Sequence, residues 1–332
     1  MQTRRLGREG PVVSAIGLGC MGMSDFYGTA DEAESLATIR AAVEAGVNLL
    51  DTGDFYGSGH NELLIARALE GIPRDRVFIA VKFGALRDPG GGFLGFDSRP
   101  AHVRNYLAQT LRRLRTGYVD LYQPSRVDPG VPIEEVVGTI ADLVRAGYVR
   151  YLGLSEAGPE TLRRAARVHP VVQLQLEYSL MSRGIEARVL PACRELGIGI
   201  TAYGVLSRGL LGGRIGPAGP DRPRDGRGRF PRFQGENLRH NLELVEALKA
   251  LAAERGATPG QLAIAWALSR GEDVIPLVGA RRRDQLADAL RALELRLGPD
   301  DLARIDAAVP AEAVAGTRYD SHGMGTLDSE RG

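Results

Sequence analysis

Short apolar runs of strand length alternate along the chain with segments in which apolar residues return every three or four positions. Eight runs have the length and β-branched character of strands, at 15–19, 47–51, 77–83, 119–123, 149–154, 171–176, 198–203 and 274–278. Helical patterns lie between them, at about 29–45, 98–114, 133–143, 160–168, 185–196, 258–269 and 284–293. Eight strands alternating with helices predict an α/β fold, a (β/α)8 TIM barrel.

A doubly wound parallel sheet is the competing fold. Gly17, Gly19 and Gly22 have the spacing of a dinucleotide-binding turn, but residues 23–28 continue as loop and no helix opens at Gly22, as that motif requires. We therefore favour the barrel. Its first helix is expected to begin in a capping box made by Thr29 and Glu32.

Two segments fall outside the repeat. Residues 3–14 are predicted to form a hairpin that closes the floor of the barrel, with Gly7 and Gly10 as turn residues. Residues 204–237 are rich in Gly, Pro and Arg, and a loop of this length suits a lid over cofactor phosphates; a solvated loop fits the pattern equally well. An extra helix follows at 237–255. No domain boundary is visible, so we expect one barrel domain over residues 1–332.

Composition narrows the class of protein. The 332 residues carry 42 basic and 41 acidic side chains, a formal net charge of +1 that gives no reason to expect nucleic acid or a membrane surface as a partner. Cys20 and Cys193 are the only cysteines, too few for a disulfide framework and too far apart for a zinc ligand set. No signal peptide and no apolar run long enough to span a membrane are visible. These features predict a cytoplasmic protein without a metal; they indicate no oligomeric state.

Lysine is rare in this chain, where Lys82 and Lys249 stand among 40 arginines. Lys82 lies in an apolar strand, and the pKa of an ammonium responds to its surroundings, so Lys82 is a candidate for proton chemistry; a lysine reaching to solvent from a strand end is the plain alternative. Asp51 and Tyr56 follow the preceding strand. We expect Asp51 to hold Lys82, and the Lys82 ammonium to lower the pKa of the Tyr56 phenol.

These residues belong to motifs that run through nearly the whole chain. The motifs are RLG (5–7), GLGCMGM (17–23), DTGDFYG (51–57), GHNE (59–62), AVKFG (80–84), GLSE (153–156), QLQLEY (173–178), Tyr203 with RGLL (208–211), GARRR (279–283) and QL (285–286). Their number and order resemble the aldo-keto reductases, in particular the bacterial and plant branch that includes pyridoxal-reductase-like members.

The resemblance implies a barrel that binds NADPH and reduces a small-molecule carbonyl compound, with Tyr56 as general acid, Lys82 as its partner and Asp51 as the partner of Lys82. It also implies that Ser155, the residue at Glu156 and Gln175 hold the nicotinamide amide while Tyr203 stacks on the ring. The other cofactor contacts that it implies are Gly22, Met23, Asp51, Gly204, Leu206, Gly209, Arg214, Gly279, Arg281 and Gln285.

The triplet Arg281-Arg282-Arg283 opens the last helix of the repeat, where the resemblance implies the 2′-phosphate of the adenosine. Helix amides and a guanidinium suit a phosphate, which favours NADPH over NADH, although an arginine triplet in an arginine-rich chain is also typical of a solvated face. Gln285 is the implied contact to the adenine.

The chain departs from the family after the fourth strand. Ser125 stands where most members carry the fourth catalytic residue, a histidine that hydrogen-bonds the substrate carbonyl. We expect Ser125 to take that position as a weaker donor, supplemented by a water or by Arg126, which would slow simple aldehydes and leave activated ones reducible.

Three functional interpretations follow. The first is an NADPH-dependent carbonyl reductase acting on pyridoxal, an aromatic aldehyde, or a keto intermediate of a biosynthetic pathway. The second is an NADPH-binding regulatory protein with little turnover, because the family also contains ion-channel subunits. The third is reduction of a conjugated C=C bond, because replacing the histidine by Ser125 changes the geometry of proton donation.

Overall fold

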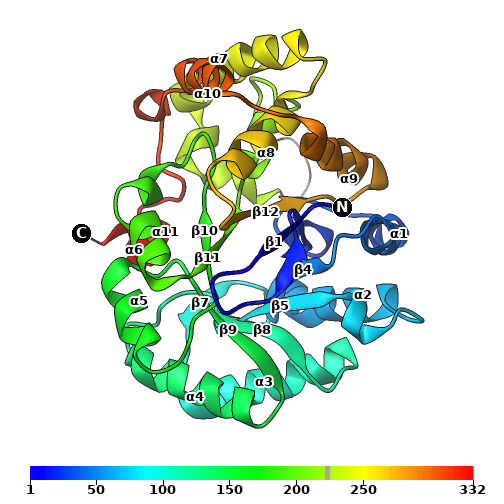
Figure 1. Ribbon diagram of the computed structural model, residues 1–332, viewed down its shortest axis with the longest axis vertical. Helices are drawn as coiled ribbons and strands as arrows, with labels where there is room; N and C mark the ends of the chain where they lie inside the picture. Colours follow the sequence, from blue (N-terminus) through cyan, green and yellow to red (C-terminus); the bar gives the residue numbers. More distant parts are fainter. Residues whose placement is uncertain (221–224, 332) are drawn as a thin grey trace.

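The computed structural model describes residues 1–220 and 225–331, which contain a closed barrel of eight parallel strands (Figure 1). In chain order these strands are β3 (Gly17–Gly19), β4 (Leu49–Gly53), β5 (Phe78–Phe83), β8 (Val119–Pro124), β9 (Val149–Ser155), β10 (Gln173–Glu177), β11 (Gly199–Tyr203) and β12 (Val274–Gly279). Each strand pairs with its neighbour in the chain, and β12 pairs with β3 to close the ring. Each of the eight predicted runs falls on one of these strands, so the predicted TIM barrel is confirmed.

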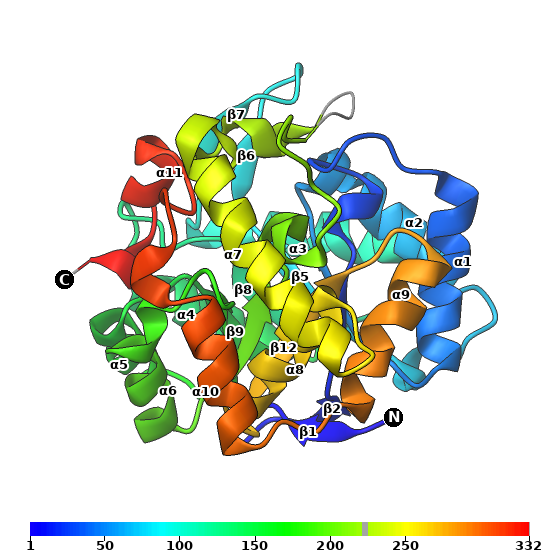
Figure 2. The ribbon, with the colours of Figure 1, turned by 90° about the horizontal axis from the view of Figure 1, so that it is seen from above.

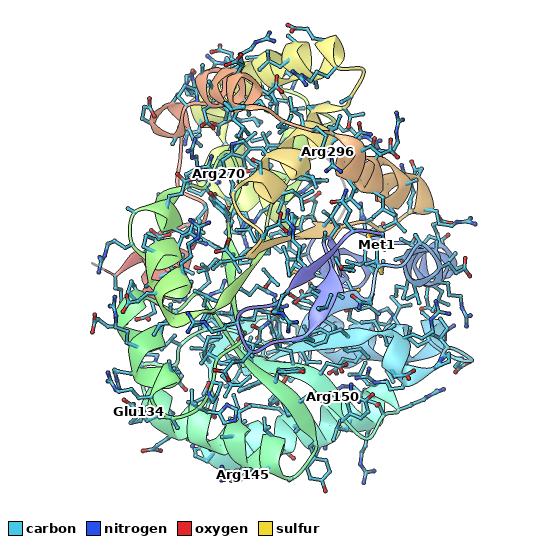
Figure 3. All side chains as sticks on the ribbon, in the orientation of Figure 1. Met1, Glu134, Arg145, Arg150, Arg270 and Arg296 are labelled. Atoms are coloured by element: carbon cyan, nitrogen blue, oxygen red, sulfur yellow. The ribbon has the colours of Figure 1, made fainter. Side chains whose placement is uncertain are left out.

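Helices surround the barrel (Figure 1). They are α1 (Glu32–Glu44), α2 (His60–Ala68), α3 (Pro100–Leu114), α4 (Ile133–Arg145), α5 (Pro159–Ala166), α6 (Val189–Leu196), α7 (Gly235–Glu254), α8 (Pro259–Ser269) and α9 (Arg283–Leu290), followed by α10 (Pro299–Ala308) and α11 (Ser321–Gly325). On α4, Val136, Ile140 and Leu143 face the core, while Glu134 and Arg145 lie at the outer edge of the molecule (Figure 3). The apolar period read from the sequence thus identifies the buried face.

The core has two layers. One lies between the strands and the helices, and the smaller one fills the inside of the barrel with residues such as Leu49, Phe78 and Leu121. Leu6 and Val13 belong to this inner layer and come from a hairpin, β1 (Thr3–Arg5) with β2 (Val12–Ser14). The hairpin and the strands β6 and β7 lie at opposite ends of the molecule (Figure 2), so the hairpin covers the amino ends of the barrel strands.

Several local predictions differ from the structure. Asp31, and not Thr29, caps α1, because the Asp31 carboxylate accepts the Glu34 amide hydrogen at 2.9 Å. The helices α2, α10 and α11 were not predicted. Nor was the hairpin of β6 (Ala85–Arg87) and β7 (Phe93–Phe96), whose glycine-rich connection gave no alternating pattern.

Two segments gather above the carboxyl ends of the strands. The first is the lid, residues 204–237, which folds into short 3₁₀ turns at Ser207–Gly212, Gly226–Arg229 and Pro231–Phe233; its residues 221–224 lie outside the described part of the chain. The second is the C-terminal segment, residues 314–331. Asn241 of α7 exchanges two hydrogen bonds of 2.9 Å with the backbone of Ala315, which ties this segment to the helix after the lid.

Candidate active site

A cavity of about 1040 Å³ lies at the carboxyl ends of the barrel strands, under the lid. Every strand of the barrel contributes to its wall, either directly or, for β8, through the second residue after the strand. These wall residues are Gly19, Asp51, Lys82, Arg126, Ser155, Gln175, Tyr203 and Gly279. This is the end of a TIM barrel at which active sites form.

Asp51 and Lys82 form a buried ion pair in this wall. Parallel pairing of β4 and β5 sets Gly53 opposite Lys82, and the Lys82 ammonium reaches back to both Asp51 oxygens, at 2.6 and 2.8 Å. Gln175 from β10 donates to the same carboxylate at 2.7 Å. Burial lowers the pKa of Lys82, and the Asp51 charge opposes that effect. The pair therefore places a buried ammonium, a group that bears protons, in the wall of the cavity.

Tyr56 lies over this pair. It begins a tight turn, Tyr56–Gly59, in which Gly57 and Ser58 have φ of 56° and 52°, and the turn brings its ring to 5.1 Å from the Lys82 ammonium. The predicted lowering of the Tyr56 pKa is wrong for this structure. Burial raises the pKa of Tyr56 well above 10, the Asp51 charge adds to the rise, and the Arg126 charge opposes it.

The residues expected to hold a nicotinamide lie at or near the carboxyl ends of β9, β10 and β11. Ser155, Gln175 and Tyr203 all line the cavity, and the Ser155 hydroxyl is buried with no hydrogen-bond partner among the described residues. Glu156 differs from the expectation. It is not part of the described cavity wall, and its carboxylate is bound by Arg318 through two hydrogen bonds of 2.7 Å.

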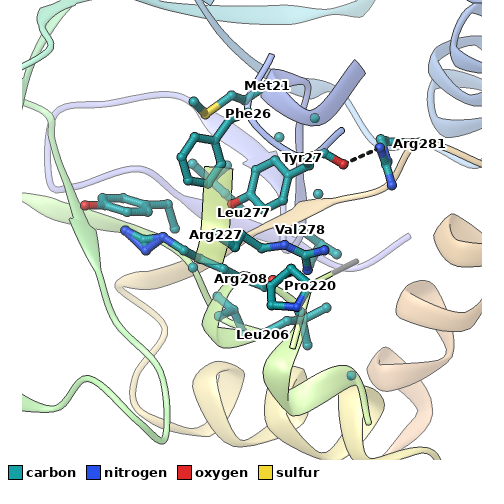
Figure 4. A pocket seen from close by; sticks show the side chains of 18 of the residues that line it. Met21, Phe26, Tyr27, Leu206, Arg208, Pro220, Arg227, Leu277, Val278 and Arg281 are labelled. Atoms are coloured by element: carbon teal, nitrogen blue, oxygen red, sulfur yellow. Dashed lines mark hydrogen bonds between the residues drawn. The ribbon is translucent and has the colours of Figure 1, made fainter. Parts of the chain in front are cut away.

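The lid crosses the cavity and meets the loop after β3. Asp225 forms an isolated bridge with Tyr27, and the Gly226 amide donates to the Phe26 carbonyl at 2.8 Å. Figure 4 shows Phe26 and Tyr27 on one side of the cavity and Arg208 and Arg227 on the other. The lid residues expected to contact a cofactor also line the cavity: Gly204, Leu206, Gly209 and Arg214.

The far end of the cavity is formed by Gly279, Arg281 and Gln285. The Arg281 guanidinium donates to the Tyr27 carbonyl at 2.8 Å (Figure 4), and its backbone amide donates to the Gln285 side chain at 3.0 Å. Arg282 and Arg283 do not line the cavity in the described part of the chain. They pair with Asp284 and Glu34, so the triplet contributes one cation to the cavity and two to the surface.

Besides Glu156, two expected site residues do not belong to the described cavity wall. Gly22 and Met21 belong to that wall, whereas Met23 is buried and does not. Ser125 is buried too and does not belong to that wall, although the adjacent Arg126 does.

Sequence reasoning missed several wall residues, among them Arg208, Phe230 and Tyr319. Arg208 lies in a motif that was quoted without a role, and Phe230 lies in the segment predicted to be a lid. Tyr319 comes from the C-terminal segment, where no periodicity or motif marks it.

Two features are absent from residues 1–220 and 225–331, the part of the chain that the structure describes. No cluster of three or more His, Cys, Asp or Glu side chains there could hold a metal ion. Within the same ranges, no helix is long and apolar enough to cross a membrane.

Comparisons with known proteins agree with this geometry. A family model described as "Aldo/keto reductase family" matches residues 15–310. A probable aldo-keto reductase 1 from Glycine max is 42% identical over 320 residues, which cover 96% of this chain and 92% of that protein.

Solved structures give the same result. A glycerol dehydrogenase from Gluconobacter oxydans superposes with a TM-score of 0.84 and 31% identity, covering 93% of this chain and 96% of that one. The holo form of an aldo-keto reductase from Bacillus halodurans superposes with a TM-score of 0.78 and 28% identity, covering 97% and 99%.

Proposed function

The chain belongs to the aldo/keto reductase family, and we propose that it reduces an aldehyde or ketone to the alcohol with NADPH, using Tyr56 as the general acid. One observation carries the proposal. The Asp51–Lys82 pair, with Tyr56 over it, lines the same cavity as Ser155 and Tyr203, the residues proposed to hold the nicotinamide. A proton donor and a hydride donor would thus meet in one enclosed space, as carbonyl reduction requires.

The residues of the cavity fit a nicotinamide cofactor, which this family uses. The volume of about 1040 Å³ is at the upper end for small-molecule sites and suits a dinucleotide with a small substrate. The buried Ser155 hydroxyl, unpartnered among the described residues, is available to the nicotinamide amide, and Tyr203 offers a ring to stack on it. Arg214 and Arg281 supply positive charge for phosphates, and Arg281 supports NADPH over NADH. When bound, the reduced nicotinamide supplies a hydride.

The chain's own residues supply the proton and the positioning. Tyr56 donates its phenolic proton to the carbonyl oxygen as that oxygen gains charge. Lys82 stabilises the phenolate that remains, and Asp51 with Gln175 keeps the Lys82 ammonium in place. Because burial raises the pKa of Tyr56, the phenol stays protonated at neutral pH, the form that a general acid needs.

Ser125 in place of the usual histidine bears on the choice of substrate. A site with weaker polarisation of the carbonyl favours activated substrates, such as pyridoxal or nitrobenzaldehyde. A glycerol dehydrogenase among the structural neighbours supports testing alcohol oxidation as well.

The test is NADPH consumption by the wild type and by Tyr56→Phe, with pyridoxal, nitrobenzaldehyde and an enone as substrates. We expect consumption that depends on Tyr56 and an alcohol product. Saturated product with the carbonyl retained would favour C=C reduction. NADPH binding without turnover on any substrate, in either direction, would favour the regulatory alternative.

A further inference from the structure

Ser125 occupies the sequence position of the usual histidine but does not supply its hydrogen-bond donor to the cavity. Its hydroxyl is buried, has no hydrogen-bond partner among the described residues, and does not belong to the cavity wall that the structure describes. Arg126, the next residue, does belong to that wall. A second donor for the substrate oxygen, beside Tyr56, would therefore come from another side chain.

Arg126 differs from three other arginines at this end of the barrel in the groups that it contacts. Arg208 pairs with Glu177 at 3.0 Å, Arg227 with Asp225 at 2.6 Å and Arg318 with Glu156 at 2.7 Å. Arg126 bonds two neutral oxygens, the Ser125 carbonyl at 2.6 Å and the Tyr319 hydroxyl at 3.1 Å. Its Nε is buried, and within residues 1–220 and 225–331 it has no partner.

Among the described residues, no carboxylate is in direct contact with the Arg126 guanidinium, although the Glu156 charge acts on it at longer range. A negatively charged oxygen in the cavity would give it a direct partner. A carbonyl oxygen becomes such an oxygen as the hydride reaches the carbon. The Arg126 guanidinium, whose direct partners in the described structure are neutral oxygens, is thus suited to the transition state of the proposed reaction.

Tyr319 fixes the guanidinium from the C-terminal segment. Tyr203 donates its single hydroxyl proton to Glu156 at 2.6 Å, so it can only accept from the Tyr319 hydroxyl, 2.9 Å away. The Tyr319 proton is then committed to Tyr203, and its oxygen presents a lone pair to Arg126. Arg318, the preceding residue, anchors the segment on the buried Glu156.

Arg126 also acts electrostatically on the proposed acid. Burial raises the pKa of Tyr56, and the Arg126 charge opposes that rise. The same charge contributes to the lowered pKa of Lys82, behind the effect of burial. The guanidinium is therefore within electrostatic reach of both groups that handle the proton.

We propose that Arg126, positioned by Tyr319, donates N–H hydrogen bonds to the carbonyl oxygen of the substrate in place of the missing histidine. This inference rests on the proposed function. The C=O π bond breaks as carbon gains the hydride and oxygen gains the Tyr56 proton. Arg126 keeps its own protons throughout, because a guanidinium is not deprotonated in proteins, and stabilises the charge that develops on oxygen.

The main test is Arg126→Gln. We expect kcat/KM to fall by about 10²- to 10³-fold, the effect of losing one donor to an oxyanion, with NADPH binding unchanged. The pH profile gives a second readout. Activity needs protonated Tyr56 and falls as pH rises through its pKa; without the Arg126 charge that pKa is higher, so the falling limb moves to higher pH.

Three further variants keep the inference falsifiable. Ser125→His in the Arg126→Gln background should restore part of kcat/KM. Tyr319→Phe keeps the ring and removes the hydroxyl, so it should cause a smaller loss. Arg126→Lys keeps the charge without the planar fork and should fall between Arg126→Gln and the wild type.

Arg74→Gln is the matched control. Arg74 is also partly buried and pairs with Asp120 at 2.6 Å, but it lies at the amino end of β5, away from the cavity. This change should lower the melting temperature and leave kcat/KM and the pH limb unchanged.

The outcomes separate the two proposals. A folded Arg126→Gln with wild-type kcat/KM and pH limb would overturn the role of Arg126, while Tyr56→Phe remained inactive. If Arg126→Gln does not fold, wild-type kinetics in both Arg126→Lys and Tyr319→Phe would overturn it. An active Tyr56→Phe would overturn the proposed function itself.

Discussion

Two buried ion pairs lie at the carboxyl ends of the barrel strands and differ in what they join. Asp51 and Lys82 come from adjacent strands, β4 and β5, and face the cavity. Glu156, directly after β9, is paired with Arg318 of the C-terminal segment, 162 residues away in the chain, and does not belong to the described cavity wall.

The electrostatics of the two pairs differ as well. Burial lowers the pKa of Lys82, so this ammonium holds its proton less strongly than an exposed lysine does. Burial opposes ionisation of Glu156, but Arg318, Arg126 and Ser329 outweigh it and lower the pKa of Glu156 to about 2. The Asp51–Lys82 pair is suited to proton transfer. In the Glu156–Arg318 pair the carboxylate stays ionised at neutral pH, so it can anchor the segment that carries Tyr319.

Exchanging the cation in the first pair should have the largest effect. Lys82→Arg keeps the charge, but a guanidinium is larger and its pKa cannot be tuned, so we expect kcat to fall by about 10²- to 10⁴-fold. NADPH consumption with the best substrate measures this. Wild-type turnover in Lys82→Arg would mean that the site needs only a positive charge.

Breaking the second pair should mainly affect folding. Arg318→Met leaves the Glu156 carboxylate buried without its main partner, so we expect a loss of about 3–5 kcal/mol in the free energy of unfolding, measured by denaturant titration. Arg318→Lys should lose less, because one ammonium can still reach the carboxylate. A loss below about 1 kcal/mol, the value typical of exposed pairs, would contradict the anchoring role.

The second pair also predicts a pH dependence of stability. The pKa of Glu156 is about 2 in the folded protein, against its usual 4.5, so its contribution is present above pH 4.5 and is lost as the pH falls toward 2. The stability difference between the wild type and Glu156→Gln should therefore shrink over this range. Denaturant titrations at pH 7 and pH 3 measure it, and a constant difference would contradict the assignment.

A surface pair gives the smallest effect. Arg164 binds both oxygens of Glu134, at 2.7 and 2.6 Å, yet both side chains are about two-fifths exposed. Glu134→Ala should change the free energy of unfolding by less than about 1 kcal/mol. A loss as large as that of Arg318→Met would show that burial is not what distinguishes the pairs.

The sequence alone was sufficient to predict the barrel and the Asp51–Lys82 pair. Apolar runs marked all eight strands, because strands buried on both faces need continuous apolar residues. The rarity of lysine singled out Lys82, and strand ends placed Asp51 and Tyr56 beside it. These features are local in the chain, so a local pattern can reveal them.

The Glu156–Arg318 pair and the position of Tyr319 in the cavity wall could not be predicted from a local pattern in the sequence. Arg318 and Tyr319 lie in a segment without periodicity, and only the folded chain brings them to Glu156 and Arg126. The direction of the Tyr56 pKa was also misjudged, because the proximity of Lys82 was visible in the motif while the depth of burial was not.

The most direct test of the account is to measure NADPH affinity and kcat together for Tyr56→Phe. The ring remains and only the hydroxyl is lost, so the account predicts an unchanged dissociation constant for NADPH and a fall in kcat of about 10²- to 10⁴-fold. Wild-type kcat in this variant, with NADPH still bound, would contradict the role of Tyr56 as the proton donor.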